Sequence, residues 1–159
     1  MTEKVNILLV DDREEGLVTL EAVLNRPDYN LVKANSGNEA LAQVFAQDFA
    51  VILMDVQMPE MDGFEAARVI KQRDRSKDIP IIFVTAINKA DRYVSVGYAV
   101  GAVDYLFKPF DPEILKSKVA VFVDLYRKNR TLIRQAESLR VFERRENSRV
   151  LAELETESR

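Results

Sequence analysis

Short apolar runs alternate, along the first 124 residues, with segments in which apolar residues recur every three or four positions. The runs lack the alternation of a half-exposed strand and are typical of strands buried on both faces of a sheet, whereas the second spacing is typical of amphipathic helices. We expect strands at residues 5–10, 29–34, 49–54, 79–84 and 102–107, and helices at 13–25, 36–46, 64–72, 88–99 and from Pro112 onward. This order predicts an α/β fold, a doubly wound five-stranded parallel sheet with helices on both faces.

Each expected strand ends in, or next to, a polar residue. These residues are Asp11, Asp12, Asn35, Asp55, Thr85 and Lys108. The carboxyl ends of parallel strands lie along one edge of the sheet, which is where open α/β sheets bind their ligands. The sequence therefore predicts that the reactive groups gather at one edge.

Local signals indicate where two of the helices begin. Ser36 followed by Glu39 is the pattern of a capping box, and Asp111 followed by Pro112 is typical of a helix start. The turn after Asp55 is predicted by Pro59, which cannot donate a hydrogen bond, and by Gly63, which permits a tight entry into the next helix.

The last helix is expected to run beyond the compact domain, because no glycine or further proline follows Pro112. We place the domain at residues 1–124 and a helical extension at 125–159. Two apolar positions repeat every seven residues in this region, which predicts the seam of a parallel coiled-coil dimer. The seam residues are Phe122, Leu125, Asn129, Leu132, Ala136 and Leu139.

A helix over residues 125–159 would be ~50 Å long, and a single copy could not bury its apolar stripe. Asn129 in the seam would help to fix the register and the number of strands. The alternative is a helix that folds back on its own domain. Glu143 and Glu146 interrupt the seam before Val150 resumes it, so the far end is expected to pair less strongly.

Composition excludes several classes of protein. The 159 residues carry a net charge of −3, which argues against general binding of nucleic acid, and no apolar run is long enough to cross a membrane. We expect no nucleic-acid or membrane contact by this segment, and a cytoplasmic location. Cysteine and histidine are both absent, so the available chemistry rests on carboxylates, hydroxyls and lysine.

Three of the strand-end residues are carboxylates: Asp11, Asp12 and Asp55. Carboxylates gathered at one edge repel each other unless a cation lies among them, and hard oxygen ligands suit Mg²⁺. Thr85 could donate a hydrogen bond and Lys108 a positive charge to a phosphoryl group. This set of groups predicts phosphoryl transfer, in which a carboxylate acts as the nucleophile.

The pattern resembles the receiver domain of two-component response regulators over residues 4–124. The matching positions are Asp11-Asp12, Asp55 with Met58-Pro59 and Asp62-Gly63, Thr85-Ala86, and Lys108-Pro109-Phe110. The resemblance implies a flavodoxin-like sheet with strand order 2-1-3-4-5 and a cis peptide bond between Lys108 and Pro109. It also implies that Asp55 accepts the phosphoryl group.

The same resemblance implies the roles of the surrounding residues. Mg²⁺ would be held by Asp11, Asp12, Asp55 and the backbone carbonyl of Gln57, and Thr85 and Lys108 would bind phosphate oxygens. Tyr105, three residues before the lysine, would be the aromatic switch residue that turns inward when Thr85 moves. A tyrosine in a strand is equally well explained as part of the core.

Without histidine, the segment needs an external donor. We expect a histidine kinase, a phosphotransfer domain or a small donor such as acetyl phosphate, and no turnover enzyme in this segment itself. The chain ends without a helix stop signal, so we expect an N-terminal module of a larger signalling protein, such as a hybrid histidine kinase. The alternatives are a stand-alone dimeric response regulator that acts as an adaptor, and a self-contained Mg²⁺ phosphatase.

Overall fold

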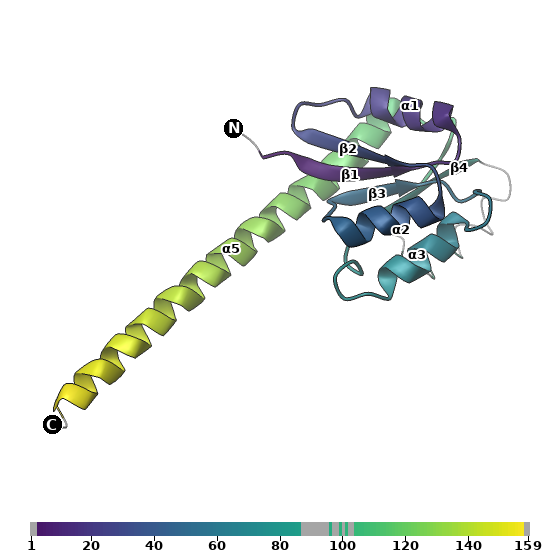
Figure 1. Cartoon of the computed structure of the whole chain (residues 1–159). Coiled ribbons are helices and arrows are strands. Elements are labelled where there is room, and N and C mark those ends of the chain that lie inside the picture. Colours follow the sequence, from purple (N-terminus) through teal and green to yellow (C-terminus); the bar gives the residue numbers. More distant parts are fainter. Residues whose placement is uncertain (1–2, 87–95, 97–98, 100, 102–103, 158–159) are drawn as a thin grey trace. The chain divides into compact units, whose positions relative to one another are not determined.

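The computed structural model of the protein describes residues 3–86, 96, 99, 101 and 104–157. Strands and helices alternate along the chain (Figure 1). The elements are β1 (Val5–Val10), α1 (Glu14–Val23), β2 (Tyr29–Ala34), α2 (Gly37–Ala46), β3 (Val51–Met54), α3 (Gly63–Lys71), β4 (Ile81–Ala86), β5 (Asp104–Lys108) and α5 (Pro112–Glu157).

The five strands form one parallel sheet in the order β2-β1-β3-β4-β5. The predicted fold class and strand order are confirmed. β3 lies at the centre, and all four of its residues are buried, as expected for a strand covered on both faces. β5 is an edge strand, and Tyr105 on it lies opposite Phe83 of β4.

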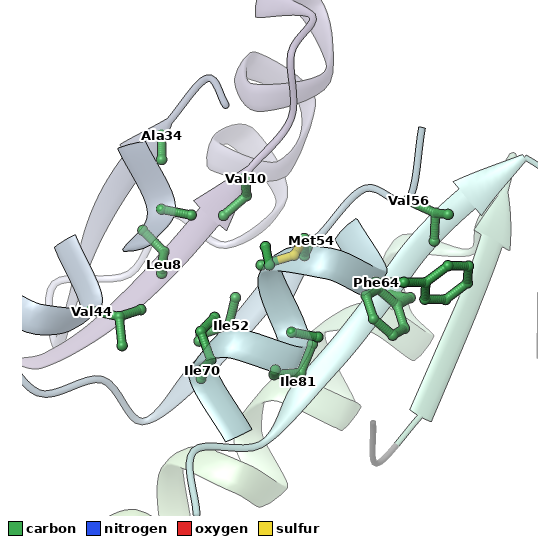
Figure 2. Packing of buried hydrophobic residues seen from close by; sticks show 14 of the residues in the cluster. Leu8, Val10, Ala34, Val44, Ile52, Met54, Val56, Phe64, Ile70 and Ile81 are labelled. Atoms are coloured by element: carbon green, nitrogen blue, oxygen red, sulfur yellow. The ribbon is translucent and has the colours of Figure 1, made fainter. Parts of the chain in front are cut away.

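Helices α2 and α3 cover one face of the sheet and α1 covers the other (Figure 1). Figure 2 shows the core beneath α2 and α3, where Leu8, Ile52 and Ile81 from three neighbouring strands pack with Val44 of α2 and Ile70 of α3. Burial of such side chains stabilises the fold by ~1.5–3 kcal/mol each.

Side chains alternate along a strand, so the residues between those that face α2 and α3 point to the opposite face of the sheet. Leu9 and Leu53 are fully buried and lie outside the α2 and α3 cluster. Leu17 of α1 and Leu115 of α5 supply buried apolar groups on their helices. The first turns of α5 are tied to β5 by an ion pair between Lys118 and Asp104.

Capping largely follows the sequence signals. The N–H of Glu39 donates to Oγ of Ser36 (3.1 Å), but the Glu39 carboxylate accepts from the N–H of Asn35 (3.2 Å) rather than from that of Ser36. The capping box is therefore only half formed, because the long glutamate side chain reaches back one residue further. Asp111 accepts from the N–H of Glu113 (2.9 Å) at the start of α5.

The ends of three strands differ from the prediction, and the first of them is β3, which begins at Val51 rather than at residue 49. β4 begins two residues later than expected and runs on to Ala86, so Thr85 lies within the strand and is paired with Phe107 instead of following the last ladder residue. β5 extends to Lys108, one residue beyond the expected end. The expected helix at 88–99 and the first two residues of the expected strand at 102–107 lie mostly outside the described residues.

The chain divides into two compact units, residues 1–123 and 124–159. Within the second unit α5 continues without interruption, and its side chains from Leu132 to Arg145 are exposed. Among the described residues, none of the helices combines the length and the apolar character needed to cross a membrane.

Candidate functional site

The sheet holds two of the predicted acidic residues in place through their own backbones. The N–H of Asp11 donates to the carbonyl of Ala34 (3.2 Å), and the N–H of Asp55 donates to the carbonyl of Val10 (2.9 Å). Each aspartate thus prolongs the strand before it by one hydrogen bond. The two carboxylates lie side by side because β1 and β3 are neighbours and end at the same level.

Three carboxylates meet at this edge. One oxygen from each of Asp11, Asp12 and Asp55 can be chosen so that all three lie within 4.8 Å of one another. Asp11 and Asp55 are buried, and Asp12 is exposed. A cluster with this spacing and only hard oxygen donors fits Mg²⁺, which takes few protein carboxylates and keeps several waters.

Lys108 is the positive charge beside this cluster. Its Nζ lies 3.1 Å from Oδ2 of Asp11 and 3.7 Å from Oδ2 of Asp55. It reaches the cluster from the end of β5, two strands away from β3. The Lys108–Pro109 peptide bond is cis, as the resemblance implied.

Asp55 has a pKa above its usual range. Burial is the main cause, because it disfavours the charged carboxylate, and the negative charge of Asp11 adds to it. The positive charge of Lys108 and hydrogen bonds from the backbone N–H groups of Gln57 and Val56 act in the opposite direction. A cation placed among the carboxylates would likewise favour the charged form of Asp55.

Glycines make room for the carboxylate of Asp11 and for the backbone carbonyl of Asp55. A Cβ atom on Gly16 of α1 would lie 2.0 Å from Oδ2 of Asp11, and a Cβ atom on Gly63 of α3 would lie 2.3 Å from the carbonyl oxygen of Asp55. Sequence reasoning missed the role of Gly16, because the need for a small residue there depends on how α1 packs beside the end of β1.

The loop after Asp55 is held in a fixed conformation. Glu60 has a positive φ of 68°, which is uncommon for a residue other than glycine, and the N–H of Met61 donates to the carbonyl of Pro59 (2.8 Å) around it. The N–H of Gly63 then donates to the carbonyl of Val56 (2.9 Å). No local pattern in the sequence predicts the conformation of Glu60.

Thr85 and Tyr105 lie on one face of the sheet. Thr85 is almost fully buried and lies opposite Phe107, while Tyr105 lies opposite Phe83 two residues earlier on each strand. Residues two apart on a strand share a face, so all four side chains point to the face covered by α3. The predicted pair of switch residues is therefore close in the fold, with Tyr105 buried.

Tyr105 is part of a row of aromatic rings. Phe64 of α3 meets Phe83 edge to face, with centroids 5.0 Å apart, and Phe83 meets Tyr105 at 5.5 Å. Phe107 stacks on Tyr105 at 5.7 Å. The row runs from α3 across β4 to the edge strand.

The predicted seam residues of α5 differ from one another in their exposure to solvent. Phe122 belongs to the first unit and is half-buried, whereas Leu125, Leu132 and Leu139 are more than half exposed. Asn129 and Ala136 are also exposed.

Comparison with known proteins gives a consistent result. Residues 7–120 match the family described as the response regulator receiver domain. The chain is 38% identical over 115 residues to the transcriptional regulatory protein ZraR of Escherichia coli, covering 72% of this chain and 25% of that protein. It is 35% identical over 118 residues to the CAI-1 autoinducer sensor kinase/phosphatase CqsS of Vibrio cholerae, covering 74% of this chain and 17% of that protein.

Among solved structures, the receiver domain of the sensor histidine kinase PA1611 of Pseudomonas aeruginosa is similar, with a TM-score of 0.69 and 30% identity. The match covers 76% of this chain and 98% of that one, and that structure is described with a magnesium ion coordinated in the active-site cleft. The chain thus spans a quarter or less of the length of the two curated relatives.

Proposed function

Because this chain belongs to the response regulator receiver domain family, we propose that it accepts a phosphoryl group on Asp55 and passes the resulting change to its last helix. The observation that carries the proposal is the position of Asp55, a buried carboxylate at the end of the central strand with two further carboxylates and an ammonium group beside it. We place the phosphoacceptor domain at residues 1–124 and the helical relay at 125–159.

In the proposed reaction an Oδ atom of Asp55 attacks the phosphorus atom of a donor phospho-histidine. The new P–O bond forms as the P–N bond breaks, and the imidazole nitrogen leaves with the electron pair of that bond. Mg²⁺ held by Asp11, Asp12, Asp55 and the backbone carbonyl of Gln57 would neutralise the negative charge that the phosphoryl oxygens bring to the cluster.

Lys108 and Thr85 are assigned to the phosphoryl oxygens. The ammonium group of Lys108 already lies close to Asp11 and Asp55. It can therefore exchange its ion pair with Asp11 for one with a phosphoryl group on Asp55. Thr85 would donate its hydroxyl hydrogen to another oxygen, because β4 is the neighbour of β3 and carries Thr85 near the same edge.

The donor is proposed to be a histidine kinase or a phosphotransfer domain, and the reaction is proposed to take place in the cytoplasm. It must cover the surface next to Asp55. A groove lined by Asp11 and Lys108 at the site and by apolar residues such as Phe110 opens there. Val18 of α1 and Ile114 of α5 are exposed apolar side chains on the helices that border the groove, and they suit the surface of a donor protein.

The relay is proposed to run from Thr85 through Tyr105 to α5. When the hydroxyl of Thr85 turns toward the phosphoryl group, the space beside Tyr105 changes, and β5 is linked to α5 through Asp104 and Lys118. This is a shift between two populated states, driven by contacts that only the phosphorylated form makes.

The structural change in α5 is proposed to act on a second copy of the chain, with which it dimerises, and on further domains of a longer protein. The exposed stripe of α5 supports a parallel coiled-coil dimer, and the short share of its relatives that this chain covers supports a module of a longer signalling protein, such as a hybrid histidine kinase. The alternative is a stand-alone dimeric regulator that acts as an adaptor, since the stripe alone could form its interface.

Incubation with acetyl phosphate and Mg²⁺, followed by intact-mass spectrometry, tests the phosphoacceptor. The wild type should gain one phosphoryl group and Asp55→Asn none. Asp74→Asn is the matched control, because the side chain of Asp74 is fully exposed, and it should behave as the wild type does. Equal labelling of Asp55→Asn would overturn the assignment.

Light scattering with and without Mg²⁺ and beryllofluoride, a mimic of the acyl phosphate, tests the dimer. A dimer in both states would support a permanent signalling stalk, and a dimer only with the mimic would make phosphorylation the assembly switch. A monomer in both states would overturn the coiled-coil assignment of α5.

A further inference from the structure

The exposed apolar stripe of α5 does not keep one heptad phase. Leu125, Leu132 and Leu139 follow each other at intervals of seven and are all exposed. Continued at the same interval, this position would be occupied by Glu146 and then Glu153. In a plain heptad this position is therefore charged after Leu139, and Val150 at the other seam position is the apolar residue that remains.

Beyond Leu139 the apolar side chains do not all keep this heptad: Val150 lies in phase with Phe122 and Asn129, whereas Leu154 lies one residue after the seam position occupied by Glu153. Val150, Leu151 and Leu154 are 47%, 60% and 53% exposed. At 100° per residue Val150 and Leu154 lie within about 20° of Leu125 around the helix axis, whereas Glu153 lies about 80° away. On a straight helix, Val150 and Leu154 therefore continue the stripe of Leu125. An unbroken repeat of seven residues would not place Leu154 in it.

The continuous stripe is obtained by adding four residues to the heptad pattern. From Leu139 it advances by four to Glu143, by four to Asn147, by three to Val150 and by four to Leu154. Two successive steps of four are a stutter, which locally unwinds a left-handed coiled coil.

We propose that α5 pairs with a second copy of this chain in two segments, residues 125–139 and 147–154, joined by a stutter with Glu143 and Asn147 in the interface. This proposal rests on the dimer proposed above and goes beyond it by fixing the register of the far segment.

A second copy is the occupant that the polar residues of the stripe fit. In a parallel, in-register pair Asn129 meets Asn129 of the other copy and Asn147 meets Asn147. An asparagine amide carries both donors and an acceptor, so two identical amides satisfy each other. The stripe from Leu125 to Leu154 is ~45 Å long, which suits a partner of the same shape and length.

The stutter is the weak point of the proposed coil. Two Glu143 carboxylates would face each other there, and like charges at an interface destabilise it. The helices can therefore part or turn locally at this point while both apolar segments stay paired. A change of rotation that arrives along α5 would be taken up here before it reaches residues beyond Leu154.

Cross-linking of single cysteines tests the register, and the wild-type chain has no cysteine that could interfere. The full chain would carry Leu139→Cys, Glu146→Cys, Asn147→Cys, Glu153→Cys or Leu154→Cys and be oxidised at one protein concentration. Leu139→Cys reports on the dimer itself, and the other four report on the register beyond it.

We expect cysteines at 139, 147 and 154 to form disulfides ~10-fold faster than those at 146 and 153, because only facing positions bring two Cα atoms within disulfide range. Faster linkage at 146 and 153 would show an unbroken heptad and overturn the stutter while leaving the dimer intact. Equal rates at all four would show that no register is fixed beyond Leu139. Absence of linkage at 139 would overturn the dimer itself.

Deletions supply a second measurement. Removal of residues 144–147 takes out the four additional residues and should bring Val150 into the heptad phase of Leu125 and Leu154 into that of Asn129, so the helix should melt at a higher temperature. Removal of residues 141–147 takes out a whole heptad and keeps the phase break, so no increase is expected. An increase with the second deletion alone would contradict the stutter.

Discussion

The Nζ atom of Lys108 lies 3.1 Å from Oδ2 of Asp11. Its distance to Oδ2 of Asp55, the proposed phosphoacceptor, is longer at 3.7 Å. Lys108 is thus paired most closely with a carboxylate that the proposed cation also requires. The lysine and the cation compete for Asp11, and a phosphoryl group on Asp55 would offer the ammonium group a new partner.

Replacement of Lys108 by Met should therefore have opposite effects on two measurements. Affinity for Mg²⁺, measured by calorimetry, should rise about three- to tenfold because a nearby positive charge is removed. The rate of phosphorylation by acetyl phosphate should fall by ~10-fold or more, since a charge-assisted hydrogen bond is worth about 1.5–3 kcal/mol. Lys116→Met, which removes an exposed lysine paired with Glu113, should change neither. Unchanged values in Lys108→Met would contradict the competition.

Asp55→Asn should stabilise the metal-free protein at neutral pH. The pKa of Asp55 is raised by burial and by Asp11, so the folded state holds this proton to higher pH than the unfolded chain does. Stability is then lost as the pH rises through the folded pKa, and the charged carboxylate costs stability at neutral pH. The amide removes that cost, and we expect the melting temperature to rise by ~2–5 °C.

The same comparison in buffer below pH ~3.9 serves as the control for this sign. Below the ordinary pKa of an aspartate both states bind the proton, so the advantage of Asp55→Asn should disappear. A difference in melting temperature that is constant over the whole pH range would show that the substitution acts through packing instead.

Gly16→Ala should damage the metal site as well as the fold. The new Cβ would overlap Oδ2 of Asp11 at 2.0 Å, so the carboxylate must move, and overpacking of this kind costs about 1–3 kcal/mol. Affinity for Mg²⁺ should fall by ~10-fold, since the three carboxylates no longer converge.

Gly101→Ala is the matched control. Gly101 has a φ of +99°, so an alanine there is strained by ~1–3 kcal/mol, but its nearest neighbour is the side chain of Lys71. Both variants should melt at lower temperature in thermal unfolding, and only Gly16→Ala should bind Mg²⁺ more weakly. Equal loss of binding in both would indicate a general effect of reduced stability.

Thr85→Ala should separate phosphorylation from the structural response. Without the hydroxyl, Asp55 should still be labelled by acetyl phosphate to within about fivefold, since Thr85 is not the nucleophile and the loss of a hydrogen bond worth ~1 kcal/mol changes a rate by about that factor. The shift of a fluorinated Tyr105 on addition of beryllofluoride, followed by ¹⁹F NMR, should be lost in Thr85→Ala and kept in Thr85→Ser. Retention of the shift in Thr85→Ala would remove Thr85 from the proposed relay.

Leu139→Glu should dissociate the proposed dimer. Two charges in place of a buried leucine pair cost several kcal/mol in an interface of this kind, which corresponds to at least ~100-fold in affinity. Ser138→Glu adds the same charge one residue earlier, outside the stripe, and should remain dimeric in light scattering. Receiver labelling at Asp55 should be unchanged in both. Equal dissociation would point to the charge rather than its position.

The sequence predicted the sheet and the identity of the strand-end residues because apolar runs report burial directly. Val51 to Met54 could only be a strand covered on both faces, and Asp55 had to follow it at the edge. The parallel sheet then brings Asp11 next to Asp55 without any information about side chains. Periodicity and topology were sufficient for these features.

Other features depend on packing that no local pattern encodes. Which carboxylate Lys108 approaches depends on how its flexible side chain crosses the edge of the sheet, and it lies nearest Asp11. Thr85 was expected after the end of its strand, but pairing with β5 extends the strand past it. Gly16 is required by the approach of α1 to Asp11, and an isolated glycine in a helical pattern carries no sign of that contact.

The aromatic row has a consequence for the strength of the signal. Tyr105 touches Phe83 on one side and Phe107 on the other, so a ring halfway through a rotation would lose both contacts at once. Packed cores of this kind hold discrete arrangements rather than a continuum. Partial phosphorylation should then yield two ¹⁹F resonances of Tyr105 that exchange intensity, not one that drifts. The extent of phosphorylation would then determine how many molecules have switched, and each molecule would respond in an all-or-none manner.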